Sequence, residues 1–513
     1  MLSVYLIIQI GAKAQYYPLQ PPIKDGKDYN KDRPHVNPYD LPIRTLADYW
    51  KTIKRLEAAK GRITQYNDIV KETGVSGLPI CAASPAFSHP FFFPLDPFHL
   101  FYENCMPHFW DMWVTGTKEE EIVHMSQEMA SKLGAEAENA VATLPSSFCG
   151  PIRDVHKKRQ SQYKIYEWMA LLHWYIVPIA WEFGFDKKVV ENFALFSNVV
   201  EYAMTITTRT QADLLKLSTK IVNFLEGFEC LYVDKEPSRI TRCRLCVFQL
   251  IHIPHHISYN GSIRFGSQAT CERAIGDIGH GIRSKKSPFK NIVSYKEDKQ
   301  SVRLLHLVYP TVSSAPKAEN ESMSPLFTKV PITQRQRKED EVIKAHIELI
   351  QSYPGVDVDE IMRWGKCSLS NNITLTSRLF ELSKRSTSRS SRYFEAHSKQ
   401  GMQPRNQPIH DTEIEVENVE PIFGEALAFY STQVAGAKIS LVVYHPLMEL
   451  HNLFGRWYGK WSPSLCVLET SAIVSLVGIW TYNENVHILR KPPGLTLLTL
   501  DESGIENPLI DVE

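Results

Sequence analysis

A carboxylate and an imidazole stand three residues apart inside an apolar, aromatic stretch of this chain. Asp96 and His99 lie within residues 91–104, among phenylalanine, leucine, proline and tyrosine side chains. An isolated carboxylate is costly to bury, so the fold must supply a partner for Asp96. The residues alone allow two interpretations. One is a structural Asp–His pair within a core, and the other is an acid–base or metal-binding site.

The net charge of the chain limits how it could bind nucleic acid. The 513 residues carry 57 basic and 57 acidic side chains, so the formal net charge is zero. Any contact with nucleic acid must therefore come from local basic patches rather than from the field of the whole protein. The hydrophobic share of 43% and the charged share of 22% are those of a globular protein. A chain of this length holds about two to four domains.

The cysteine count and the hydropathy of the chain indicate the cellular compartment in which it folds. Nine cysteines, an odd number, do not indicate a disulfide framework, and we expect a reducing compartment. No apolar run reaches the roughly 18 residues of a membrane span, so no membrane partner is expected. Residues 1–10 are apolar but lack a basic flank, and Gln9 interrupts them. A secretory signal is therefore disfavoured, and a buried strand or a truncated start are the alternatives.

Apolar spacing predicts helices over much of the first 230 residues. Residues 45–72 show helical spacing that is broken at Gly61 and ends before Gly74. Further helices are expected at 117–142, 160–183, 188–206 and 209–230, and we interpret their aromatic stripes as core. Residues 78–96, apolar and punctuated by proline, are expected to form a short strand that ends at Asp96.

The C-terminal part changes character. Residues 311–345 are typical of a linker, and residues 376–400 are rich in serine and arginine. Four short runs at 437–444, 464–469, 472–480 and 486–489 are typical of strands. Their spacing predicts a small β-rich module, with a barrel as one form.

A second dense motif follows the helical region. It comprises His252-Ile253-Pro254, Gly261-Ser262, Ser267-Gln268, Glu272-Arg273-Ala274-Ile275-Gly276, Ile282-Arg283-Ser284-Lys285 and Pro288-Phe289. The first motif reads Leu95-Asp96-Pro97-Phe98-His99-Leu100, then Tyr102-Glu103-Asn104 and Pro107. The two together resemble blocks of fungal transposase-domain proteins, relatives of the CACTA (En/Spm-type) cut-and-paste DNA transposases. The resemblance covers about residues 11–310.

The resemblance implies a fold and a chemistry. The expected fold is mixed α+β or α/β and helix-rich: an incomplete RNase H-like core, interrupted by a large helical domain, with a small C-terminal β-rich module. The expected segments are an extended N-terminal part at 1–44, a core at 45–310, a basic linker at 311–404 and the β-rich module at 405–513. In such a core Glu272 would be the last catalytic carboxylate, Asp96 an earlier one, and His99 its companion.

Strand transfer explains why carboxylates would be needed. It is a phosphoryl transfer in which two Mg²⁺ ions about 4 Å apart clamp the attacking and leaving oxygens, and such ions prefer oxygen ligands. Asp96 and Glu272 would be these metal ligands. The resemblance also implies a double-stranded DNA partner, such as the ends of a mobile element. It implies nuclear localisation and is compatible with a homo-oligomer.

The chain departs from the family pattern in one respect. The first catalytic aspartate should follow a strand well upstream, but no apolar strand leads to any earlier aspartate here. We therefore expect a degenerate or truncated enzyme, ancestrally a Mg²⁺-dependent DNA nuclease and strand transferase. The alternative is a non-catalytic, domesticated DNA- or protein-binding module. A hydrolase that uses Asp96 and His99 ranks last, since no G-x-S-x-G nucleophile motif is present.

Two further sets of side chains have functional and structural interpretations. Arg283, Lys285, Lys286 and Lys290 follow Glu272 and could bind DNA phosphates, as could the basic residues of the stretch 376–400. The structural interpretation is a solvated charged loop. Cys243, Cys246, His252 and His255 have ligand chemistry suited to zinc. The gap between the pairs is shorter than in a zinc finger, so core or interfacial cysteines and histidines are favoured and zinc is not expected.

Overall fold

The computed structural model describes most of the chain. Its main described stretches are residues 37–40, 45–88, 92–159, 163–268, 286–309, 336–352, 356–368, 374–383, 389–397, 421–434 and 437–495, with short pieces of one to four residues elsewhere. The chain divides into two compact units. The helical unit comprises Met1–Ala135, Arg153–Leu304 and Pro492–Leu509. The β unit comprises Glu136–Ile152, Leu305–Lys491 and Ile510–Glu513.

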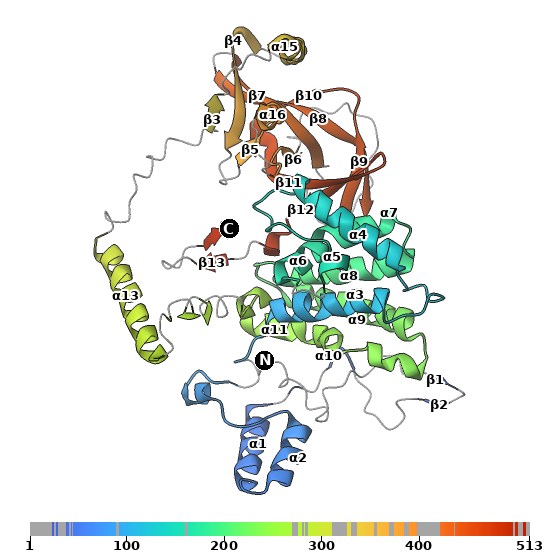
Figure 1. The fold of residues 1–513 in the computed structure, drawn as a ribbon, viewed down its shortest axis with the longest axis vertical. Coiled ribbons are helices and arrows are strands. Elements are labelled where there is room, and N and C mark those ends of the chain that lie inside the picture. Colours follow the sequence, from blue (N-terminus) through green and yellow to red (C-terminus); the bar gives the residue numbers. More distant parts are fainter. Residues whose placement is uncertain are drawn as a thin grey trace. The chain divides into compact units, whose positions relative to one another are not determined.

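The helical unit begins with a helical hairpin. Helices α1 (Leu46–Ala58) and α2 (Ile63–Thr73) follow one another (Figure 1). Thr45 and Asp48 form a capping box that satisfies the first backbone N–H groups of α1. Gly74, with φ of 70°, ends α2 in the left-handed region, where glycine is favoured. Tyr49 and Phe87 pack with a ring separation of 5.5 Å in the small core of this hairpin.

The rest of the helical unit surrounds an aromatic core. Phe109 contacts the rings of Phe193, Phe196 and Phe228 at 5.2–5.9 Å. The helices that supply these rings are α3 (Met106–Val114), α8 (Lys187–Met204) and α9 (Gln211–Phe228). The other elements of this unit are η3 (Phe98–Cys105), α5 (Val155–Lys158), α6 (Ile165–Ala170), η5 (Leu171–Tyr175), α7 (Ile176–Glu182), η6 (Glu229–Val233), η7 (Pro237–Arg242), α10 (Leu245–Phe248), η8 (Gln249–His252), α11 (Ile253–Asn260) and η9 (Ile263–Gly266). Two more helices, α4 (Gln127–Asn139) and α13 (Pro288–Val308), begin in the helical unit and end in residues assigned to the β unit.

The β unit contains a closed six-stranded antiparallel barrel (Figure 1). The strands are β6 (Tyr393–His397), β7 (Pro421–Val434), β8 (Ala437–Leu453), β9 (Arg456–Trp461), β11 (Ile473–Tyr482) and β12 (Asn485–Arg490). Pairing runs β8–β9–β12–β11–β6–β7, and β7 pairs again with β8, which closes the ring. Further strands extend the sheet: β3 (Leu326–Lys329), β4 (Val356–Ser368), β5 (Thr374–Thr376) and β10 (Cys466–Glu469).

Alternating apolar side chains explain why this sheet closes. Tyr393, Phe423, Leu447, Val477 and Ile488 come from five of the barrel strands and form one buried cluster. Trp457 and Trp461 of β9 pack against the same cluster. A closed barrel buries one face of every strand and leaves no edge unpaired within the ring. The tight turn Phe454–Gly455 between β8 and β9 has positive φ at both residues, as a two-residue hairpin requires.

These observations correct the expected fold class. Among the described residues of the helical unit, strands occur only as the short pairs β1 (Ile23–Lys24) with β2 (Lys27–Asp28) and β13 (Leu498–Leu500) with β14 (Glu506–Pro508). The central sheet of an RNase H-like core is not formed there, so that prediction is wrong. Residues 78–88 contain the single-turn helix η2 (Ile80–Ala83) instead of a strand. The β-rich part is also larger than a small C-terminal module.

Candidate functional site

Asp96 lies two residues before the helical segment η3, and its carboxylate contacts residues of that segment. Its side chain is 3% exposed. One carboxylate oxygen accepts the backbone N–H of Phe98 at 3.0 Å, and the backbone carbonyl of Asp96 accepts the N–H of Leu100. Asp96 thus caps the first turn of η3, a role for which aspartate is well suited. Proline at 97 fits this position, since it has no backbone N–H to satisfy.

His99 bridges two carboxylates along the same helical segment. Its Nδ1 is ion-paired with the second oxygen of Asp96. Its Nε2 lies 3.1 Å from Oε2 of Glu103, one turn further on. Asp96 is buried, whereas Glu103 is 52% exposed and His99 is 32% exposed. The imidazole ring donates to both carboxylates only when both of its nitrogens carry protons.

The remaining polar residues of the motif also make local contacts. The Asn104 side-chain amide donates to the backbone carbonyl of His99 at 2.5 Å. Tyr102 points into the core, where its hydroxyl lies 3.0 Å from Nε2 of His173. His173 in turn contacts Glu201 at 3.1 Å. Each polar side chain of the first motif is therefore used to hold η3 in place.

This geometry limits the chemistry available to Asp96. Both of its carboxylate oxygens already have partners, a backbone N–H and an imidazole N–H. A bridging metal ligand in two-metal catalysis must offer its oxygen lone pairs to the ions. Asp96 could do so only by giving up the cap of η3 and its pair with His99. Among the described residues, no group of three or more histidine, cysteine, aspartate or glutamate side chains is placed to hold a metal ion.

The second motif is only partly described. Glu272, Arg283 and Lys285 lie outside the described residues. Lys286 and Lys290 are exposed, in the turn before α13 and in its first turn. The structure thus places these two lysines on the surface.

The segment considered for zinc lies in the core of the helical unit. His252 and His256 are 3% and 1% exposed. Burial lowers the pKa of His252 to about 3 and that of His256 to about 4, so both rings are neutral. Nδ1 of His256 accepts the backbone N–H of Leu95 at 3.3 Å, which ties this segment to the residue before Asp96. The thiol of Cys105 donates to the backbone carbonyl of Cys246.

The backbone at Gly266 packs closely against the backbone of Leu95. A Cβ atom at this position would lie 2.1 Å from the backbone oxygen of Leu95. Glycine is therefore required where η9 passes the residue before Asp96. The two motifs, about 160 residues apart in sequence, meet through Leu95, His256 and Gly266.

Sequence reasoning paired Asp96 with His99 but gave no role to Glu103 or to the Leu95–His256 contact. The i, i+3, i+7 spacing of Asp96, His99 and Glu103 was the available signal, because such residues share a helix face. The contact with His256 has no local signal, since it joins distant segments.

Comparison with known proteins gives no independent guide. No family model, no curated protein and no solved structure matches this chain. None of the described helices is long and apolar enough to span a membrane.

Proposed function

We propose that this chain is a transposase-derived protein that binds double-stranded DNA without cutting it. The absence of cutting rests on one observation, the engagement of Asp96. Its two oxygens hold the first turn of η3 and His99, in a site that is 3% exposed. A catalytic carboxylate must instead face the metal ions and the scissile phosphate. The transposase origin rests on the resemblance of the two motifs.

Helix α13 and the turn before it supply a surface suited to DNA. Lys286 and Lys290 are exposed there. Lys296, Lys299 and Arg303 follow at spacings that place them on one face of the same helix. Two acidic residues, Glu297 and Asp298, accompany them. A helix face with three cations at this spacing can contact successive backbone phosphates without reading sequence.

The test is binding of the full-length chain to a fluorescent duplex with 5′-hydroxyl ends. We expect the affinity to fall steeply between about 50 and about 200 mM salt, as counterions are released. The variant Lys296→Gln/Lys299→Gln/Arg303→Gln should weaken binding. It should also make the plot of log affinity against log salt concentration less steep by about 3, as expected when three phosphate contacts are lost. The matched control Lys51→Gln/Lys54→Gln/Lys71→Gln removes three exposed charges from α1 and α2 and should bind as the wild type does. Equal loss in both variants, or no binding, would refute the DNA-binding proposal.

A second measurement addresses cutting. Supercoiled plasmid is incubated with the chain and Mg²⁺ or Mn²⁺, beside the variant Glu272→Gln. We expect no nicking by either protein. Metal-dependent nicking by the wild type that disappears in Glu272→Gln would show an active nuclease and contradict the proposal.

A further inference from the structure

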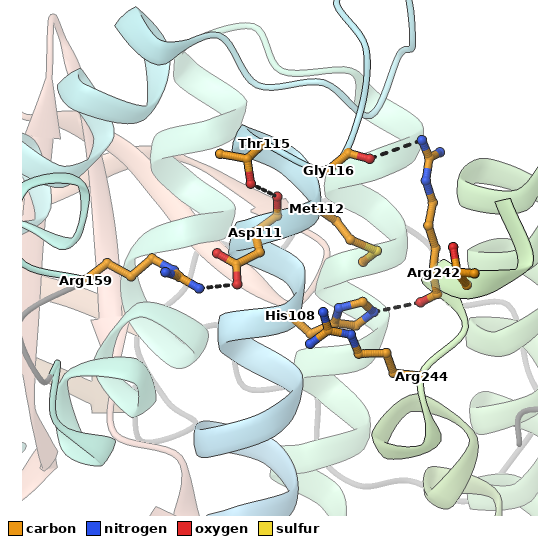
Figure 2. A pocket seen from close by; sticks show the side chains of 9 residues that line it. His108, Asp111, Met112, Thr115, Gly116, Arg159, Arg242 and Arg244 are labelled. Atoms are coloured by element: carbon orange, nitrogen blue, oxygen red, sulfur yellow. Dashed lines mark hydrogen bonds and ion pairs between the residues drawn. The ribbon is translucent and has the colours of Figure 1, made fainter. Parts of the chain in front are cut away.

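Arginine side chains gather around an open pocket in the helical unit. The pocket has a volume of about 470 Å³ and lies between α3, the end of α5 and the segment that joins η7 to α10. Figure 2 shows Arg159 approaching α3 from one side, while Arg242 and Arg244 stand on the other. The volume falls in the range of small-molecule sites, about 300–1,000 Å³.

Two of the three arginines that line this pocket have acidic partners, and among the described residues the third does not. Arg159 is ion-paired with Asp111, and Arg242 binds Glu121 at 2.6 and 2.9 Å. Arg244 also lines the pocket, is exposed, and has no ion pair within the described part of the chain. The pocket therefore has a positive charge in excess of its acidic partners.

A buried imidazole adds a second, independent feature. His108 is 2% exposed, and its Nε2 donates to the backbone carbonyl of Arg242 at 2.7 Å. Burial, with a smaller contribution from Arg244, lowers the pKa of His108 to about 4, so the ring is neutral. Its Nδ1 is then a hydrogen-bond acceptor, and it has no partner among the described residues. Nε of Arg159 is likewise a buried donor without a partner there.

We propose that this pocket binds the phosphate group of a small phosphorylated molecule that also carries a hydroxyl or amino donor, such as a nucleotide. Arg244 and Nε of Arg159 supply donors for the phosphate oxygens, and guanidinium groups suit phosphate geometry. Nδ1 of His108 accepts a hydrogen bond from the donor on the ligand. Leaving a buried acceptor unpaired is costly, which favours a ligand that satisfies it. This inference does not rest on the proposed DNA binding.

The experiment is calorimetric titration of the full-length chain with four small probes and one oligonucleotide pair. The small probes are inorganic phosphate, ribose 5-phosphate, AMP and adenosine, and the pair is one short single strand with a 5′-phosphate and with a 5′-hydroxyl end. We expect the phosphorylated probes to bind and adenosine to bind much more weakly. Preference for AMP assigns a free nucleotide as the source, whereas preference for the 5′-phosphorylated strand assigns a nucleic-acid end.

Variants decide whether binding occurs in this pocket. Arg244→Gln should weaken binding of the preferred phosphorylated probe at least about tenfold, because a charge-assisted hydrogen bond is lost. Thr241→Glu, which places a negative charge at the exposed rim, should have the same effect. Arg239→Gln is the matched control, since Arg239 lies in η7 but does not line the pocket. No binding of any phosphorylated probe at millimolar concentration, or equal affinity in Arg244→Gln and wild type, would overturn the proposal.

Discussion

At the scale of single residues, Asp96 has the clearest role. Its carboxylate accepts the Phe98 N–H and pairs with His99 in a buried site. We expect Asp96→Ala to lower the free energy of unfolding by about 1–3 kcal/mol, because a helix cap and a charge partner are lost. The measurement is urea denaturation followed by tryptophan fluorescence. Because the role is structural, Mg²⁺ and EDTA should leave the wild-type midpoint unchanged.

A control variant shows whether the loss of stability is specific to Asp96 or follows the removal of any carboxylate. Asp68 lies exposed on α2, so Asp68→Ala should change stability by less than about 0.5 kcal/mol. If Asp96→Ala were as stable as Asp68→Ala, the capping role of Asp96 would be wrong. If Mg²⁺ stabilised the wild type but not Asp96→Ala, Asp96 would be a metal ligand.

At the scale of elements, the histidine-rich segment formed by η8 and α11 predicts a pH dependence. Burial holds the pKa of His252 at about 3 and that of His256 at about 4, below the usual value near 6.5. Between the lowered pKa of each ring and its usual value near 6.5, the unfolded chain therefore binds more protons than the folded chain. The stability from these neutral rings is complete above about pH 6.5 and is lost as the pH falls toward about 4.

Denaturation midpoints measured across this pH range test the sign. We expect the midpoint to fall as the pH decreases from about 6.5 to about 4, and His252→Gln to show a shallower fall because one titrating group is gone. A variant that keeps the full wild-type slope would show that His252 is not the buried neutral group assigned here.

The elements also show what local sequence could and could not predict. The break at Gly61 and the end of the second helix at Gly74 follow from glycine conformations, and α1 and α2 confirm both. The helix expected from residue 117 begins only at Gln127 in α4, because the acidic stretch before it forms turns. Glu121 of that stretch is bound by Arg242, a partner 121 residues away that no local pattern indicates.

At the scale of the whole molecule, the chain path crosses between the two units. Residues 136–152 belong to the β unit, although the residues on both sides belong to the helical unit. Arg389 fixes this segment by donating to the backbone carbonyls of Leu144, Pro145 and Cys149. Sequence periodicity contains no information about such an exchange, and the RNase H-like expectation came from two short motifs rather than from the pattern of strands.

This connection gives a prediction for the β unit. Arg389→Ala should destabilise the full-length chain by about 2–4 kcal/mol, because three backbone carbonyls lose a charged donor. Arg378→Ala is the control: Arg378 is 51% exposed and makes one longer contact with Glu425, so its loss should cost less than about 1 kcal/mol. Thermal unfolding of both variants measures the difference, and equal midpoints would show that the Arg389 contacts do not hold residues 136–152.

DNA binding without cutting is tested by measuring the affinity of the full-length chain for duplex DNA as a function of salt, with a nicking assay on the same preparation. We expect salt-sensitive binding that weakens in Lys296→Gln/Lys299→Gln/Arg303→Gln, with no nicking in Mg²⁺. Metal-dependent nicking that disappears in Glu272→Gln, or the absence of salt-sensitive binding, would show that the proposed function is wrong.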